Sequence, residues 1–458
     1  MGKSMAETRD VAAGRCTAPA LAEAFADLHA PLTEQQAYNE SSRCFYCHDA
    51  PCLEACPTGI DIPGFIRRIA TGNATGAGRT ILDSNIMGAT CARVCPVEEL
   101  CEEVCVRNTG DHKPVTIAQL QRFATDALFD ANMQPYARAA ETGKKVAIVG
   151  AGPAGLACAH RLARYGHDVV VYEARAKAGG LNEYGLAAYK MPDNIAQREI
   201  DFILSVGGIT IETGKALGKE LSLDQLTSDH DAVFLGLGLS AVNALGLDGE
   251  NVDAVEDAVD YISDLRQAVD LSAVAVGRRV VVIGGGNTAI DAAVQAKRLG
   301  AEDVTLVYRR GPEQMGATDF EQDLAQTNGV IIRHWAMPVA IKGENGSAVE
   351  MTFEATQLDG NGRLEGTGAR FTLMADQVFK AIGQAFDAAP LGGGAAPEVS
   401  DGRIVVDENG KTSVNGVYAG GDCVAGQDLT VSAVEDGKVA AEAIHLELSG
   451  QNSNKGVS

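Results

Sequence analysis

The chain has 458 residues, of which 46% are hydrophobic and 22% are charged, and its formal net charge is −23. This length exceeds that of one ordinary core and predicts two or three domains. So acidic a protein repels nucleic acid and anionic membrane surfaces, and we expect neither as a partner.

The first residues lack the apolar segment of a secretory signal, and no run of about eighteen apolar residues is present. We therefore expect a cytoplasmic protein. In that reducing compartment, clustered cysteines are more often metal ligands than disulfides.

The sequence of residues 1–140 predicts helices and loops. Eight of the chain's eleven cysteines lie in this segment, from Cys44 to Cys105. The first group is Cys44-x2-Cys47-x4-Cys52-x3-Cys56-Pro57, and the second is Cys91-x3-Cys95-x5-Cys101-x3-Cys105. Thiolates spaced in this way can meet at one metal centre without the backbone folding back on itself. Bacterial ferredoxins use a comparable run, in which the fourth cysteine precedes a proline and binds the other cluster.

Two other interpretations of the cysteines explain less of this pattern. A zinc ribbon needs two CxxC pairs well separated in sequence, and this segment has one. A thioredoxin-like dithiol at Cys44 and Cys47 would leave six neighbouring cysteines unexplained. Two [4Fe–4S] clusters account for the whole field.

A strand, a glycine turn, an amphipathic helix and a second strand follow from Lys144, which together form a βαβ unit. Its turn predicts dinucleotide binding by Gly150, Gly152, Pro153, Ala154, Gly155 and Leu156. Glu173 ends the next strand, where an acid accepts hydrogen bonds from ribose hydroxyls.

A second βαβ unit begins at Gly277, and its turn supplies Gly284, Gly285, Gly286, Asn287 and Thr288. Arg309 and Arg310 follow its second strand, where arginine suits the 2′-phosphate of NADP.

Near the C-terminus, NGVYAGGDC at residues 415–423 resembles the second FAD fingerprint of two-domain flavoprotein reductases. The resemblance implies that Asp422 binds FAD and that a helix starting near Thr430 faces the isoalloxazine. The run GGLNEYGLAAYKMP at residues 179–192 matches the flavin-side loop of that family and adds Gly180, Leu181 and Lys190.

The cysteine field with its flanks, SRCFYCHDAPCLEACPTGIDIPGFI, GATCARVCPVEELCEEVC and VTIAQLQRFATDALF, resembles the N-terminal region of dihydropyrimidine dehydrogenases. The resemblance implies interleaved ligand sets. One cluster takes Cys44, Cys47, Cys52 and Cys105, and the other takes Cys56, Cys95, Cys101 and Gln121. Cys91 is then a bystander, and Val94 contacts the cofactor. Without the resemblance, Gln121 would be interpreted as an ordinary helix-surface residue.

The resemblance spans nearly the whole chain and is greatest to electron-input subunits of the bacterial NAD-dependent enzymes. It implies hydride transfer from NADH to FAD, and single electrons passed through the clusters. The animal enzymes add an FMN-bearing barrel, so we expect the pyrimidine site on an FMN-containing, dihydroorotate-dehydrogenase-like partner. In this family, members that use NADP carry a further arginine. The corresponding position in this chain is Gly316, with Glu313 close by. The resemblance therefore favours NADH as the coenzyme, with NADP(H) as the alternative.

Two alternatives remain. The small subunit of NADPH-dependent glutamate synthase shares this architecture, but it usually has a shorter spacing at Cys95-x5-Cys101 and an acidic residue at the position of Gln121. A general electron-transfer adaptor without a fixed reaction would carry the same motifs.

The predicted fold is α/β, with a helical iron–sulfur domain before two Rossmann-like domains. We expect the helical domain at 1–140, the FAD domain at 141–240 and 385–458, and the NAD(P) domain at 241–384. Since the cofactors supply the chemistry, no catalytic acid or base is predicted.

Overall fold

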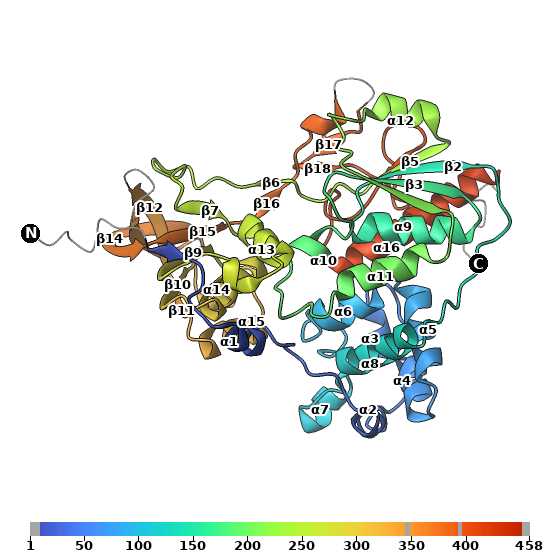
Figure 1. Ribbon diagram of the computed structural model, residues 1–458, viewed down its shortest axis with the longest axis horizontal. Helices are drawn as coiled ribbons and strands as arrows, with labels where there is room; N and C mark the ends of the chain where they lie inside the picture. The colour runs from blue at the N-terminus through green and yellow to red at the C-terminus, as the bar shows by residue number, and fades with distance from the viewer. Residues whose placement is uncertain (1–9, 344–348, 393–395, 451–458) are drawn as a thin grey trace, which may run out of the picture. The chain divides into compact units, whose positions relative to one another are not determined.

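The computed structural model describes residues 10–343, 349–392 and 396–450 (Figure 1). Its internal contacts divide these residues into two compact units. Unit 1 holds residues 10–28, 184–192 and 241–385, and unit 2 holds residues 29–183, 193–240 and 386–450. Among the described helices, none is long and apolar enough to cross a membrane.

Unit 2 begins with a group of helices, drawn in blue to cyan in Figure 1. They are α2 (Glu34–Ser41), α3 (Pro51–Glu54), α4 (Ile62–Ala70), α5 (Ala74–Ser84), α6 (Gly88–Val94), α7 (Arg107–Asp111) and α8 (Ile117–Asp130). Helix α4 shows why they form, because the Asp61 side chain caps it by accepting from Gly64 N at 2.9 Å. Phe65, Ile66 and Ile69 lie on its buried face.

The rest of unit 2 is a parallel five-stranded sheet with the order β19-β5-β2-β3-β4. Its strands are β2 (Lys145–Val149), β3 (Asp168–Glu173), β4 (Ile209–Thr213), β5 (Ala232–Leu235) and β19 (Val417–Ala419). Its helices are α9 (Pro153–Arg164), α10 (Leu181–Tyr184), α11 (Ile195–Leu204), α12 (Leu223–Asp229) and α16 (Thr430–Leu448), and the short β17 (Val399–Ser400) and β18 (Arg403–Ile404) complete it. β2 is buried at four of its five positions, as a central parallel strand should be.

Helices α9 and α16 pack against each other at very close range. A Cβ at Gly437 of α16 would lie 2.1 Å from Ala154 O of α9, so only glycine allows this approach. The contact fixes the start of α16 beside the glycine turn that precedes α9.

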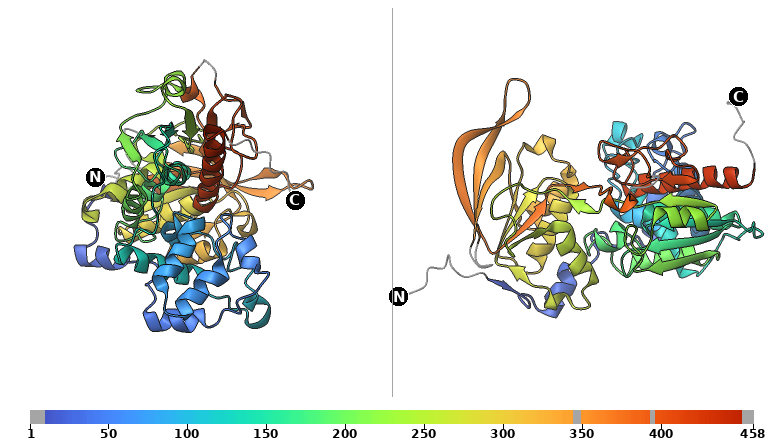
Figure 2. Two further views of the ribbon diagram at one scale, coloured as in Figure 1. Left: turned by 90° about the vertical axis from the view of Figure 1, so that its right-hand side faces the viewer. Right: turned by 90° about the horizontal axis from the view of Figure 1, so that it is seen from above.

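Unit 1 has its own parallel sheet, with the order β11-β10-β9-β15-β7. Its strands are β7 (Val255–Asp257), β9 (Arg279–Gly284), β10 (Asp303–Val307), β11 (Ile331–Arg333) and β15 (Gln377–Ala381), and its helices are α1 (Ala18–Ala24), α13 (Ala258–Gln267), α14 (Asn287–Arg298) and α15 (Asp319–Thr327). A separate antiparallel sheet, orange in Figure 2, contains β12 (Ala336–Lys342), β13 (Val349–Leu358) and β14 (Leu364–Ala375). The pairs β1 (Val11–Ala12) with β8 (Val276–Gly277) and β6 (Ala241–Val242) with β16 (Gln384–Ala385) complete the unit.

The predicted fold class is confirmed, since a helical segment precedes two Rossmann-like sheets. The three predicted domain ranges stay predictions. The contacts join the helical and FAD segments into unit 2, whereas residues 10–28 pack with the second Rossmann-like sheet in unit 1.

Candidate functional site

The four cysteines predicted for the first cluster line one cavity in the helical part of unit 2. Cys44, Cys47, Cys52 and Cys105 surround a space of about 400 Å³, part of which is open to solvent. Ile62, Ile66 and Val115 form its apolar wall. Four thiols around a mostly apolar space form a suitable donor set for an iron–sulfur cluster.

Burial favours the protonated form of two of these thiols in the absence of metal. It raises the pKa of Cys44, and it raises the pKa of Cys52 to about 12. Because thiolate is the form that binds metal, a cluster must displace these protons when it binds.

A second cavity of about 390 Å³ lies beside the first, and Ile62 lines both. Its wall includes all members of the second predicted set, Cys56, Cys95, Cys101 and Gln121. It also includes Cys91 and, from the first turn of α16, Val431. The predicted set and Cys91 therefore offer five donors around a space where a four-iron cluster needs four.

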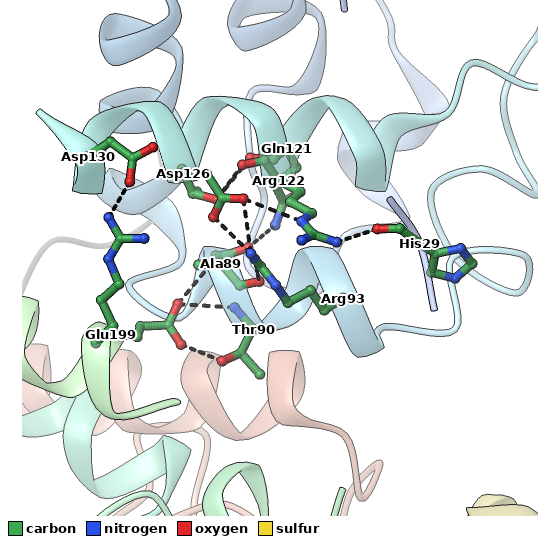
Figure 3. A network of polar contacts seen from close by, with 12 residues as sticks. His29, Ala89, Thr90, Arg93, Gln121, Arg122, Asp126, Asp130 and Glu199 are labelled. Carbon is green, nitrogen blue, oxygen red and sulfur yellow. Dashed lines mark hydrogen bonds and ion pairs between the residues drawn. The ribbon is translucent and has the colours of Figure 1, made fainter. Parts of the chain in front are cut away.

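The two competing donors, Gln121 and Cys91, differ in how they are held. A hydrogen bond with the Cys91 thiol, together with burial, raises the pKa of Cys95 well above its usual value. The Gln121 side chain is 7% exposed and donates from Nε2 to Gly88 O at 2.7 Å (Figure 3). Because this bond fixes the nitrogen, it also fixes the direction of Oε1, the atom that would bind iron.

Among the described residues, no three His, Cys, Asp or Glu side chains meet closely enough to hold a single metal ion. A cubane spreads its ligands over four irons, so its donors need not meet at one point. Val94, predicted to contact the cofactor, is the half-buried last residue of α6, just before Cys95.

The first glycine turn has the geometry of a dinucleotide site. Gly150 has φ +102°, and a Cβ there would lie 2.1 Å from Gly236 O. A Cβ at Gly155 would lie 2.0 Å from Gly150 O. A Cβ at Gly152 would have only Gly180 Cα within 4 Å, at 3.9 Å, so a pyrophosphate can approach the backbone there. The first N–H groups of α9 point toward the same space, and they favour an anion.

The two predicted acids of this site lie in different settings. Glu173, 8% exposed, accepts from Ala151 N at 2.9 Å through Oε2 and from Arg175 N at 2.8 Å through Oε1. Its remaining lone pairs can still accept from ribose hydroxyls. Burial raises the pKa of Asp422 to about 6.

The flavin-side loop and the start of α16 are joined by a hydrogen bond. Thr430 Oγ1 donates to Asn182 Oδ1 at 2.9 Å, and Asn182 Nδ2 lies 3.4 Å from Met87 Sδ just before α6. Gly180 lies against Gly152, where an added Cβ would be 2.8 Å from its Cα. Leu181 is exposed at the start of α10. Thr430, next to Val431 in the wall of the second cysteine cavity, thus joins the flavin-side loop to that cavity.

The second glycine turn, in unit 1, has the same design. Gly284 has φ +151°, and a Cβ there would lie 2.2 Å from Ala381 O. A Cβ at Gly285 would lie 2.4 Å from the Tyr308 ring, whereas one at Gly286 would have nothing within 4 Å. Asn287 and Thr288 begin α14 directly after this open position.

Arg309 and Arg310 follow β10, and their backbone carbonyls accept from Thr356 Oγ1 at 2.8 Å and Trp335 N at 3.1 Å. Within the part of the chain that the structure describes, neither guanidinium has a hydrogen-bond or ion-pair partner. Gly316 faces the turn, with its nearest atoms, Gly285 O and Gly286 Cα, 4.0 Å from an added Cβ.

Lys190 belongs to unit 1, whereas the other residues predicted to bind FAD belong to unit 2. It is 7% exposed, and its Nζ lies 2.7 Å from Asp291 Oδ1 and 2.5 Å from Glu321 Oε1. Asp291 also accepts from Tyr189 OH at 3.3 Å. Sequence patterns did not indicate Asp291 and Glu321, because their partner is about a hundred residues away.

The fold and these sites define a class of protein, an oxidoreductase with two dinucleotide-binding sheets and an iron–sulfur segment. Residues 144–437 match the family of pyridine nucleotide-disulphide oxidoreductases, and residues 21–133 match the family described as dihydropyrimidine dehydrogenase domain II, 4Fe-4S cluster.

Comparison with individual proteins narrows the class. The chain is 39% identical to the NAD-dependent dihydropyrimidine dehydrogenase subunit PreT of Escherichia coli O157:H7, over 93% of this chain and 97% of that protein. It is 34% identical to the glutamate synthase [NADPH] small chain of Escherichia coli K12, over 92% and 93%. The chain belongs to the family that contains these dihydropyrimidine dehydrogenase subunits.

Two solved structures share the fold alone. FprA of Mycobacterium tuberculosis in complex with NADPH is 20% identical, with a TM-score of 0.55 over 67% of this chain and 84% of FprA. Thioredoxin reductase of T. acidophilum is 22% identical, with a TM-score of 0.52 over 66% of this chain and 99% of that protein.

Proposed function

We propose that this chain is the electron-input subunit of a cytoplasmic dihydropyrimidine dehydrogenase. It oxidises NADH and supplies electrons to a partner subunit that interconverts uracil or thymine and their 5,6-dihydro forms. When bound, FAD accepts a hydride and gives up its electrons singly, while each of two [4Fe–4S] clusters carries one electron. The 39% identity to PreT over 93% of the chain supports this proposal.

One observation carries the proposal, namely the two adjoining cysteine cavities in the same unit as the first glycine turn. The second cavity reaches Val431 in the first turn of α16, next to Thr430. The first cavity opens among exposed apolar residues. The succession from α16 to the second cavity and then to the first cavity supports electron entry beside α16 and electron exit at the first cavity.

The partner in this proposal is an FMN-containing, dihydroorotate-dehydrogenase-like subunit. Phe45, Val104 and Val106, on the rim of the first cavity, are 59%, 38% and 40% exposed. Exposed apolar side chains around a redox centre are suited to docking, because a partner that covers them also brings its acceptor close.

The residues have separate tasks in this proposal. Gly150, Gly152 and Gly155 shape the turn that holds the FAD pyrophosphate, and Glu173 orders that turn through Ala151 N. Gly286 and the start of α14 do the same for the nicotinamide coenzyme. The first cysteine set holds one cluster, while Cys56, Cys95, Cys101 and Gln121 hold the other.

NADH is the proposed coenzyme. Arg309 and Arg310 could contact a 2′-phosphate, but glycine at position 316 leaves open the place beside the turn where a further arginine would complete that site. The NAD-dependent relatives are also more similar to the chain than the NADPH-dependent glutamate synthase small chains, at 39% against 34% identity.

The test is to purify the native complex through a tag on this chain and to identify the second subunit. We expect an FMN protein, uracil-dependent NADH oxidation, and about eight iron and eight sulfide per FAD on this chain. Co-purification of a glutamate synthase large chain, with glutamate formation, would establish the second candidate instead. Zinc, or four iron or fewer in anaerobically prepared protein, would contradict the cluster assignment.

A further inference from the structure

Glu199 is a carboxylate buried inside unit 2. It belongs to α11, is 1% exposed, and reaches the start of α6 (Figure 3). Its Oε1 accepts from Ala89 N at 2.9 Å and from Thr90 N at 3.2 Å, and its Oε2 accepts from Thr90 Oγ1 at 2.5 Å. Helix α6 has no side-chain cap of its own at Met87, so Glu199 satisfies N–H groups that the helix leaves without intrahelical partners.

The Gly88–Ala89 peptide group connects Glu199 to Gln121. Its N–H is the Ala89 N–H that donates to Glu199, and its carbonyl is the Gly88 O that accepts from Gln121 Nε2 at 2.7 Å. The chain of hydrogen bonds therefore runs from the Glu199 carboxylate through one peptide group to the Gln121 amide. Gln121 lines the second cavity.

Hydrogen bonds in such a chain polarise one another, and the effect is greater in a buried, weakly screened setting. Burial raises the pKa of Glu199 to about 7, so the carboxyl is negatively charged above neutral pH, where it draws the Ala89 N–H and makes the Gly88 carbonyl more negative. That carbonyl in turn draws the Gln121 N–H, which leaves Gln121 Oε1 with more negative charge. An amide oxygen polarised in this way is a stronger donor to iron.

We propose that Glu199 is a positioning residue for the second cluster, which orients and polarises the Gln121 amide through the Gly88–Ala89 peptide. The inference rests on the proposed function, since it takes Gln121 as a cluster ligand. It assigns to α11 an influence on the potential of a cluster that α11 does not touch.

The test is a redox titration of the full chain, carrying its cofactors, followed by electron paramagnetic resonance, at a pH well above the pKa of Glu199 so that this side chain is charged. Glu199→Gln keeps the shape of the side chain and removes its charge. We expect the potential of the second cluster to rise, because reduction adds negative charge that Glu199 no longer opposes. The potential of the first cluster serves as the internal control and should not change. Iron and FAD content should remain full.

A double-mutant cycle separates the hydrogen-bond chain from simple charge repulsion. In a Gln121→Cys background no amide remains to be polarised, so Glu199→Gln should shift the second potential less than it does in the native chain. Equal shifts in both backgrounds would overturn the relay. If the Glu199→Gln protein loses iron, the Glu199→Asp variant is used in its place. Aspartate keeps the charge but shortens the reach, so we expect a small upward shift in the potential of the second cluster. An unchanged potential in this variant would overturn the proposal.

The two possible failures can be told apart with Gln121→Ala. If this variant alters the second cluster while Glu199→Gln leaves its potential unchanged, the role of Glu199 is wrong and the ligand set stands. If Gln121→Ala leaves the second cluster unaltered, the ligand assignment itself is wrong, and the inference about Glu199 is overturned with it.

Discussion

Gln121 differs from the other proposed cluster ligands because it offers a neutral oxygen instead of a thiolate. Its amide nitrogen is bound to Gly88 O, so the oxygen has a fixed direction beside Cys56, Cys95 and Cys101. Cys91 lines the same cavity and is the competing fourth ligand. Substitutions at both positions can decide between the two donors.

For Gln121→Cys we expect four irons to be kept and the second cluster's potential to fall, because a thiolate adds negative charge. Gln121→Ala should make the second cluster labile while the first survives. Cys91→Ser should leave both cluster signals intact. Electron paramagnetic resonance of the reduced protein, with iron analysis, measures all three. Loss of a cluster in Cys91→Ser, with Gln121→Ala unaffected, would assign the fourth ligand to Cys91.

We expect the choice between NADH and NADPH to depend on the residue at position 316, which is glycine in this chain. The loop that carries it is held against the glycine turn by Ala317 N, which donates to Gly285 O at 2.9 Å. Gly316→Arg should therefore place a third guanidinium beside Arg309 and Arg310. A charge-assisted hydrogen bond contributes about 1.5–3 kcal/mol, so kcat/KM for NADPH should rise about ten-fold or more.

Steady-state kinetics with both coenzymes and an artificial acceptor measure this change. The matched control is Gly360→Arg, which adds the same charge in the turn between β13 and β14, where nothing lies within 4 Å of an added Cβ. For the unaltered chain we expect kcat/KM for NADH to exceed that for NADPH by about ten-fold, or about 1.4 kcal/mol. A native preference for NADPH would show that Arg309 and Arg310 suffice for the phosphate.

Single residues were predictable from sequence where a local turn demands them. Gly150 and Gly155 are examples, since their conflicts with Gly236 O and Gly150 O follow from the fingerprint spacing. Glu199 was not predictable, because it occurs in an amphipathic segment, IAQREIDFIL, where a glutamate normally faces water. Its burial depends on α6, about 110 residues away in sequence.

At the scale of elements, the two βαβ units were predictable because each contains its strand, turn and helix within about thirty residues. The contact of α16 with α9 was not, since it joins segments about 280 residues apart. The Gly437 position shows what that contact requires, because its Cα faces Ala154 O with no space for a methyl group.

Gly437→Ala should destabilise unit 2 by about 1–3 kcal/mol, the usual cost of overpacking, although alanine is the better helix former. It should also reduce FAD content, because the methyl group pushes α16 away from the glycine turn. Denaturant unfolding and flavin absorbance measure both effects. The control is Gly110→Ala in α7, where an added Cβ meets nothing within 4 Å and stability should be unchanged or slightly higher.

At the scale of the whole molecule, the two units divide the work. Unit 2 contains both cysteine cavities and the first glycine turn, and unit 1 contains the second turn.

The segment 184–192 belongs to unit 1 although its sequence neighbours belong to unit 2. Three contacts, one of them fully buried, hold it there. Lys190 pairs with Asp291, Ala188 N donates to Gln295 Oε1 at 3.0 Å, and Arg298 stacks 4.0 Å from the Tyr189 ring. These contacts within unit 1 could not be predicted from sequence, because they join residues about a hundred positions apart, and the loop pattern alone indicated a flavin contact for Lys190.

The last prediction separates electron input from pyrimidine chemistry. The described residues of the two units account for a helical segment, two Rossmann-like sheets and a three-stranded sheet. These elements provide sites for FAD, a nicotinamide coenzyme and the clusters, and the proposal assigns the pyrimidine site to the partner. The purified chain should therefore oxidise NADH with an artificial one-electron acceptor, and it should fail to oxidise NADH when uracil is the only acceptor. Adding the purified partner should restore the uracil-dependent reaction. In a Cys47→Ser variant, which removes a proposed ligand of the first cluster, we expect flavin reduction by NADH to persist. The reaction with the partner should be lost, because the proposal has electrons leave through that cluster. Uracil-dependent oxidation of NADH by this chain alone would refute the division of labour, and full partner activity in Cys47→Ser would refute the exit at the first cavity.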